Sequence, residues 1–345
     1  MSSQIAIKRL GFFTRLLDEA TAAERYRLAL AQIQQAERCG YDSAWIAQHH
    51  FHEAEGGLPA PFVFLTHAAA HTRRIRLGTG IVTLPLEMGI RVAEDAAVLD
   101  LVCDHRLEVG VGPGGNLTAF TAFGLDSNDR HKLMHDNLET MRMAWSGGTL
   151  AGGDKLYPAS PTLVDRIWQA TFSVEGARRA GQAGDGLMLS RTQPRAADRP
   201  NATLADIQDP MIDAYLEALP KGRTPRILAS RTVFVADDSA EALRLAEIGA
   251  RRMRHRLAAT GDLSSGSLVG DLIARFDIHM GTPEEVAASL LADDTLKRAT
   301  DMTIQSHSID PPHPYILRSI ELMAEKVAPA LGWAPNRDTS ARRVA

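Results

Sequence analysis

Three histidines lie close together in the segment QHHFH, at the end of an apolar run that starts at Tyr41. Alternation along a strand would send His49 to one face and His50 and His52 to the other. Three imidazoles invite a metal site, but no carboxylate or thiolate cluster at familiar spacing completes a ligand set, so we expect no metal. An imidazole at the carboxyl end of a strand is also placed for acid–base chemistry. His49 is therefore a candidate catalytic residue, with a hydrogen-bonded structural histidine as the alternative.

A glycine-rich turn, GVGPGG, follows a later apolar run. Gly110, Gly112 and Gly115 have the spacing of a dinucleotide fingerprint, but a true fingerprint opens a helix at its third glycine. We interpret the segment that follows here, NLTAFTAFG, as a loop. Two interpretations of the glycines remain open, namely a close backbone approach to a flat ligand or a tight turn.

Ser173 lies between an apolar run and the helical pattern VEGARRAG. At that position its hydroxyl would cap the helix, and the first free amides, from Val174 to Ala177, would point back at the strand end. A helix N-terminus with a serine hydroxyl can bind phosphate. An ordinary N-cap serine is the alternative, and Glu175 would repel a phosphate if it pointed inward.

These candidates belong to a chain in which apolar runs alternate with helical patterns, which indicates parallel strands joined by crossover helices. We expect an α/β fold, a closed (β/α)8 TIM barrel with insertions, and keep an open doubly wound sheet as the alternative. Functional residues of such a barrel gather at the carboxyl ends of its strands. The eight candidate strands lie in segments 5–13, 41–51, 74–85, 106–112, 166–172, 185–191, 226–236 and 301–309.

We expect a single domain over residues 1–335, followed by a frayed tail, 336–345. Two segments interrupt the alternation and are predicted insertions or mobile loops, 192–225 and 258–281. The first is rich in Pro, Asp and Arg, with a short helix predicted around Met211 to Leu219. Long loops in compact domains are often functional, so both are candidate lids over a site.

Charge and composition narrow the class of protein. The 345 residues carry a formal net charge of -4 without a basic stripe, so nucleic acid is not an expected partner. The longest apolar runs fall well short of the roughly 18 residues that span a bilayer. The start, MSSQIAIKRLGFF, lacks the features of a secretory signal, and two cysteines make no disulfide framework. We therefore expect a cytoplasmic protein.

Several segments in this order resemble the bacterial-luciferase-like monooxygenases over most of the chain, and more closely their FMN-dependent luciferase-like subgroup. The resemblance implies a barrel that binds FMN at its carboxyl face. It also implies that a separate flavin reductase supplies reduced FMN, which reacts with dioxygen so that a flavin hydroperoxide oxidises a small organic substrate, such as an aldehyde. Members of the family commonly form homodimers. The segments are LGFFTRL, ERCGYDSAWIAQHHF, RIRLGTGIVTLP, RVAEDAAVLDLVCDHRLEVGVG, FSVEGARRAGQAGDGLM and GTPEEVAASL.

The resemblance also assigns roles to residues. His49 falls on the family's catalytic histidine, which we expect to act as a general base or proton shuttle because an unperturbed imidazole titrates near working pH. The implied cofactor-binding residues are Thr79, Gly80 and Ile81 behind the flavin ring, Gly112 near its reactive edge, and Ser173 with Val174 at its phosphate. Gly114, in the turn after Gly112, is also expected to bind the cofactor.

Some positions depart from the family pattern. Pro113 stands where luciferase has a phosphate-binding arginine, and Arg191, at the end of the sixth strand, could supply the missing charge. Gln48 replaces a glutamate before the paired histidines, and Gly112 replaces a cysteine. Two rival functions remain, a deazaflavin- or nicotinamide-dependent oxidoreductase on the same barrel and a flavin-binding protein without catalysis. The second would have a truncated barrel, whereas all eight strand segments are present here, so an enzyme is favoured.

Overall fold

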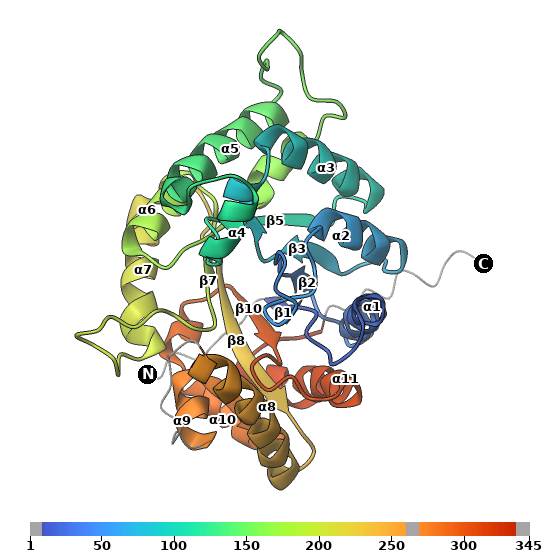
Figure 1. Cartoon of the computed structure of the whole chain (residues 1–345), viewed down its shortest axis with the longest axis vertical. Coiled ribbons are helices and arrows are strands. Elements are labelled where there is room, and N and C mark those ends of the chain that lie inside the picture. The colour runs from blue at the N-terminus through green and yellow to red at the C-terminus, as the bar shows by residue number, and fades with distance from the viewer. Residues whose placement is uncertain (1–8, 260–268, 336–345) are drawn as a thin grey trace.

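The computed structural model describes residues 9–259 and 269–335. Eight parallel strands form a closed ring, because the last strand pairs with both the first and the seventh. This arrangement confirms the predicted barrel over the predicted open sheet, and Figure 1 shows its strands at the centre with helices around them. The ring consists of β1 (Arg9–Thr14), β2 (Ser43–Ile46), β3 (Arg76–Thr79), β5 (Leu107–Gly112), β6 (Ile167–Ala170), β7 (Gly186–Leu189), β8 (Ile227–Val235) and β10 (Asp301–Gln305).

Two short strands add to the ring. The predicted strand 74–85 is divided, since β3 ends at Thr79 and β4 (Val82–Thr83) pairs separately with the end of β5. Residues Gly80 and Ile81 form the break, and the peptide bond between them is cis. The other addition, β9 (Ile278–Gly281), pairs with the second half of β8 outside the ring.

Helices cover the outside of the barrel in chain order (Figure 1). Capping hydroxyls explain where some of them begin: the side chains of Thr21 and Thr282 accept hydrogen bonds from the amides of Glu24 and Glu285. The longer helices are α1 (Ala22–Arg38), α2 (Pro61–Ala70), α3 (Gly89–Val102), α5 (Arg130–Trp145), α6 (Val174–Gln182), α7 (Leu204–Ala218), α8 (Ser239–Ala259), α10 (Pro283–Leu291) and α11 (His313–Leu322), and the shorter ones are α4 (Leu117–Ala122) and α9 (Val269–Arg275).

The segment 192–225 is more ordered than the sequence indicates. Its helix α7 begins at Leu204, several residues before the predicted start, and a capping box between Thr203 and Asp206 fixes that end. Buried side chains such as Tyr215 pack it into the outer layer against α6, so it is the crossover helix after β7. Pro210 lies inside the helix, and because proline is unusual in a helix interior, the first turns of α7 were not predicted from the sequence.

The second predicted insertion is described only in part. Its described residues form the end of α8, then α9 and β9. Residues 260–268 and the tail 336–345 lie outside the described residues, so the predictions of a mobile loop and a frayed end there stay predictions.

Tryptophans fill the interior of the barrel. Trp45 and Trp168 meet edge to face with ring centroids 5.8 Å apart, and Met188 and Leu228 complete a buried cluster around them. Among the described helices, none combines the length and apolar composition of a membrane span. A cytoplasmic location stays a prediction.

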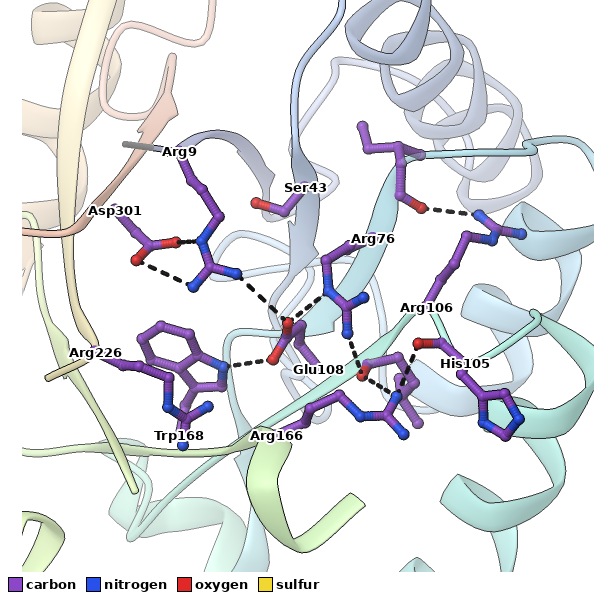
Figure 2. A network of polar contacts seen from close by, with 12 residues as sticks. Arg9, Ser43, Arg76, His105, Arg106, Glu108, Arg166, Trp168, Arg226 and Asp301 are labelled. Carbon is purple, nitrogen blue, oxygen red and sulfur yellow. Dashed lines mark hydrogen bonds and ion pairs between the residues drawn. The ribbon is translucent and has the colours of Figure 1, made fainter. Parts of the chain in front are cut away.

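An ionic layer closes the amino-terminal end of the barrel (Figure 2). Glu108, only 4% exposed, pairs with Arg76 at 2.6 Å, and Asp301 pairs with Arg9 at 2.5 Å. These residues stand at the first or second position of their strands, on the side opposite the expected site. The indole nitrogen of Trp168 donates to Glu108 at 2.8 Å, which joins this layer to the tryptophan cluster.

Candidate active site

An apolar floor lies at the carboxyl end of the barrel. Its three members, Phe13, Ile81 and Ala170, are partly exposed and pack on the buried cluster that contains Trp45 and Trp168. Each stands at the end of a strand or just beyond it, which is where a barrel keeps its functional groups. A rigid apolar surface with polar groups at its margin suits a planar aromatic ligand. We call these three residues the floor of the site.

Two of the three residues predicted to lie behind the flavin ring have structural roles in the site. Thr79 is fully buried, and its hydroxyl donates to the Gly110 carbonyl at 2.8 Å and accepts from the Gly110 amide at 2.9 Å. The backbone pairing of β3 with β5 ends at Gly78. These two hydrogen bonds of Thr79 continue the connection between the two strands beyond that point. A Cβ on Gly80 would lie 2.5 Å from the Phe13 ring, so glycine is needed for Phe13 to take its place in the floor. Ile81 alone of the three offers a side chain to a ligand.

The turn after β5 is a tight turn built by protein contacts. Gly112 is buried, and a Cβ there would come within 3.0 Å of Ile81 Cδ1. Gly114 has φ +77 and faces the Thr83 methyl, so its backbone conformation requires glycine, whereas a Cβ at Gly112 would need only a small shift of the Ile81 side chain. The prediction of a loop after this turn is wrong for residues Leu117–Ala122, which form α4. The Asn116 side chain caps this short helix by accepting from the Thr118 amide, a signal that the pattern reading passed over.

Ser173 takes the predicted N-cap position of α6. Its hydroxyl accepts from the Gly176 amide at 3.1 Å, and Thr171 Oγ1 accepts from the Ser173 amide at 3.1 Å. A Cβ on Gly176 would lie 2.0 Å from Thr171 Oγ1, so the turn closes only around glycine. Val174 points away from this turn and lines a separate cavity of about 170 Å³ beside Phe172.

Beside this turn lies a cavity of about 350 Å³ between α5 and α6, here called the α5–α6 cavity. It carries two imidazoles and two guanidinium groups, together with the single carboxylate of Glu139. This cavity was not predicted from the sequence. A signal for it was present, because the lining residues that belong to α5 recur at helical spacing along one face. Its lining residues are Pro113, His131, Met134, His135, Leu138, Glu139, Arg142, Gln169, Ala170, Thr171, Gly176, Arg179, Gln182 and Ala183.

The two guanidinium groups of the cavity differ in how closely carboxylates engage them, since Arg142 contacts both Asp185 and Glu139 whereas Arg179 has a 3.7 Å contact with Glu175. Arg142 forms an ion pair with the buried Asp185, whose pKa is raised to about 6 by burial even though Arg142 opposes the shift. Arg179 is half exposed. Glu175 itself is exposed and is not part of the lining, so the predicted repulsion of a phosphate does not arise. The first turn of α6 adds its partial positive charge.

Arg191, which was predicted to replace the family's phosphate-binding arginine, does not line the α5–α6 cavity. It is buried and donates to the hydroxyls of Thr232 and Ser308, at 3.0 and 3.2 Å. Burial, reinforced by the charge of Arg15, lowers its pKa to about 9. Pro113, which stands in the position of the family's arginine, lines the α5–α6 cavity. The cations that the structure does bring to the Ser173 turn are Arg179 and Arg142.

His49 follows β2 but is not part of it, since the strand ends at Ile46 and the predicted alternation of the histidines does not apply. Its Nε2 is 2.8 Å from a guanidinium nitrogen of Arg15. Burial, then the charges of Arg15, His307 and His50, lower the pKa of His49 to about 3. The imidazole is neutral at working pH, so the pKa on which the predicted proton shuttle depends is displaced far from neutrality. A catalytic role for His49 stays a prediction.

The other two histidines contribute to an aromatic rim. His50 meets the Phe123 ring edge to face at 4.9 Å, and Phe51 lies 5.8 Å from Phe123. The nearby His52 contacts the Thr118 hydroxyl at 3.2 Å, which joins this loop to α4. Phe51 and Phe123 are 68% and 41% exposed, unusual for such large apolar side chains. Within the described residues, no three metal-ligating side chains converge.

The apolar floor and the adjoining α5–α6 cavity both lie at the carboxyl face of a parallel barrel, where barrels of this kind keep their functional groups. The sequence profile of the luciferase-like monooxygenase family matches residues 10–298. The chain therefore belongs to that family, and the predicted oxidoreductase is confirmed at that level.

Solved structures agree with this assignment. The monooxygenase RslO1 from Streptomyces bottropensis is 26% identical, with 93% of this chain and 99% of that chain covered and a TM-score of 0.78. Two more distant structures share the fold alone. One is the oxygenating constituent of 3,6-diketocamphane monooxygenase from Pseudomonas putida, in complex with FMN (20% identity, 94% and 98% coverage, TM-score 0.72). The other is the coenzyme F420-dependent tetrahydromethanopterin reductase from Methanopyrus kandleri (17% identity, 94% and 100% coverage, TM-score 0.68).

Proposed function

We propose that the protein is an FMN-dependent monooxygenase, which uses reduced FMN and dioxygen to oxidise a small organic substrate. The observation that carries this proposal is the pairing of the floor with the α5–α6 cavity, since the two adjoin at Ala170. Their chemistry matches the two ends of FMN, an apolar ring system and a phosphate. Membership of the monooxygenase family supplies the reaction class.

The residues present fit such a cofactor. Arg179 would hold the phosphate as a charged donor, together with the open amides of the first turn of α6. His131, whose pKa is lowered by burial and by the charges of Arg130 and Arg179, would add a neutral donor, and His135 lines the same cavity. The floor would hold the ring, with Ile81 as its contacting side chain among the three residues predicted behind the flavin.

When bound, reduced FMN supplies the electrons that activate dioxygen, and the protein supplies position and shielding. The floor and the tryptophans beneath it exclude water from one side of the ring, which suppresses side reactions with solvent. The exposed aromatic rim of Phe51 and Phe123 offers an apolar approach to the mouth. This surface favours an uncharged organic substrate, of which a small aldehyde is one example.

A deazaflavin is the second candidate cofactor, because a structural relative of this chain depends on coenzyme F420. Assays with chemically reduced FMN or reduced F420 and a panel of aldehydes and ketones separate the two, with oxidised product and hydrogen peroxide measured beside oxygen uptake. Our proposal predicts oxidised substrate with FMN and dioxygen but not with F420, and a matching decrease in hydrogen peroxide, because reduced FMN consumes dioxygen even without substrate. Substrate turnover with F420, without oxygen uptake, would favour the deazaflavin enzyme, and bound FMN without any turnover would favour a non-catalytic flavin-binding protein.

Two partners belong to the proposal. A separate flavin reductase would supply reduced FMN. A second copy of the chain would cover exposed apolar side chains on adjacent helices, since Val98, Leu101 and Val102 form a stripe on α3 and Val63 is 74% exposed on α2. Contiguous exposed apolar surface of this kind marks interaction sites.

A further inference from the structure

The contact between Arg15 and His49 fixes which nitrogen of the imidazole carries its proton. A guanidinium group has donors and no acceptor, so at 2.8 Å its N–H must donate to Nε2 of His49. Nε2 then has its lone pair occupied by that bond. In the neutral ring the hydrogen consequently lies on Nδ1.

The Nδ1 atom has no partner of its own. It is buried, and within the described residues it makes no hydrogen bond. The loop after β2 holds the residue in this position, because the His49 amide donates to the Leu58 carbonyl at 2.9 Å. A Cβ on Gly56 would lie 2.4 Å from Nδ1, so Gly56 packs directly against the imidazole and no larger residue fits there. A buried donor without an acceptor is costly unless a ligand completes it.

The charges around His49 oppose its protonation. The groups that act on it are Arg15, His307 and His50, all of them cationic or neutral. Asp310, whose charge interacts with Arg15, pairs with His307 at 2.8 Å. Arg191 adds a further positive charge, since it acts on both Arg15 and His307. Arg15, His307 and His50 each make a positive charge on the His49 ring unfavourable.

We propose that Arg15 is a positioning residue that holds His49 as a neutral imidazole with its hydrogen on Nδ1, so that His49 donates a hydrogen bond to an oxygen atom of the bound ligand. This inference rests on the proposed function for the identity of the ligand, a flavin or an oxygen-bearing substrate. It differs from the general-base role, because no proton leaves or reaches the ring. His49 would stabilise negative charge that develops on that oxygen.

The direct test is nitrogen NMR of the imidazoles in the ligand-free protein, with His49 assigned by comparison with His49→Gln. Wild-type protein should show the Nδ1–H tautomer and no titration of His49 between pH 5 and 8. Arg15→Met should raise the pKa of His49 by about one unit or more, because the largest charge acting on the ring is removed. Arg15→Lys, which keeps a donor and a charge, should restore the wild-type behaviour. Arg27→Met, an exposed arginine of α1, is the matched control and should change nothing.

Turnover gives the second readout. The kcat of the wild type should stay flat between pH 5.5 and 8, whereas Arg15→Met should have a lower kcat across this whole range, because its imidazole hydrogen is no longer fixed on Nδ1. An Nε2–H tautomer in the wild type, or a wild-type His49 that titrates near pH 6.5, would overturn the inference even if Arg15→Met failed to fold. The NMR result does not depend on a cofactor, so a failure of FMN binding would refute the proposed function and leave this inference to be decided separately.

Discussion

Glu108 on β5 accepts a 2.8 Å hydrogen bond from the indole nitrogen of Trp168 on β6 (Figure 2). The same carboxylate pairs with Arg76 at 2.6 Å, and the Trp168 ring packs beneath the floor of the candidate site. The ionic layer at one end of the barrel thus positions the ring that supports the other end. Binding at the mouth should therefore respond to changes at the base.

Removal of this carboxylate should be costly. Glu108→Ala leaves Arg76 and the Trp168 indole without their buried acceptor, and we expect a loss of roughly 3 kcal/mol in the free energy of unfolding. Asp237→Ala is the control, because Asp237 forms an exposed pair with Arg318 and should cost less than about 1 kcal/mol. Urea denaturation measures both. Equal losses in the two variants would show that the ionic layer stabilises the folded state no more than an exposed ion pair does.

Phosphate recognition is tested at α6. Arg179→Ala removes a cation from the α5–α6 cavity and should weaken FMN binding roughly tenfold, the usual order for one charge-assisted hydrogen bond. Riboflavin lacks the phosphate, so its affinity should not change. Arg178→Ala is the matched control on the same helix, outside the cavity lining. A loss of affinity for both flavins, or an equal effect of Arg178→Ala, would argue against this cavity as the phosphate site.

A substitution in the floor should affect FMN and riboflavin equally, unlike a substitution at the phosphate site. Ile81→Ala removes three carbon atoms from the ring site, so FMN and riboflavin should weaken by the same factor, roughly tenfold if about two of the three contact the ring. Isothermal titration of each flavin measures this. An effect limited to FMN would place Ile81 at the phosphate and contradict the proposed orientation.

Histidine burial predicts a pH dependence of stability. Burial lowers the pKa of His279 and His307 to about 4 in the folded protein, below the ordinary value of 6.5 in the unfolded chain. Between those values the unfolded state binds more protons, so stability should fall as the pH decreases from 6.5 toward 4. Each histidine contributes a slope of about 1.4 kcal/mol per pH unit at most. Urea denaturation from pH 7 to 5 should show a smaller slope in His307→Asn, and an unchanged slope would contradict the assignment.

Self-association is tested on α3. Leu101→Asp places a charge on the exposed apolar stripe, 44% exposed in the single chain, and should shift the protein from dimer to monomer. Analytical ultracentrifugation reports the mass directly. Leu243→Asp is the control, since Leu243 is a similarly exposed leucine on α8. A wild-type protein that is monomeric at micromolar concentration would refute the dimer.

Local patterns were sufficient to predict the barrel. Each of its eight strands falls on an apolar run, and hydroxyl caps such as Thr21 and Ser173 mark helix starts within single segments. Errors occurred where a local signal was masked, as at Pro210 inside α7, or where a cap was overlooked, as at Asn116 before α4.

Contacts between residues that are far apart in the sequence could not be predicted from local patterns. The α5–α6 cavity joins Arg179 to His131 of another helix, and only the folded chain reveals that they share one space. The environment of His49 depends on Arg15, thirty-four residues earlier, so its displaced pKa could not be read from its own segment. Arg191 follows β7, but its hydroxyl partners come from β8 and from the segment after β10, so its surroundings could not be predicted from its own segment.

The central claim is that the floor and the α5–α6 cavity together bind FMN. An anaerobic equilibrium titration of the purified protein with reduced FMN tests it most directly. We predict saturable binding of one FMN per chain, with riboflavin bound more weakly because the α5–α6 cavity then stays empty. Saturable binding of F420 in the absence of any affinity for FMN, in either redox state, would contradict the account.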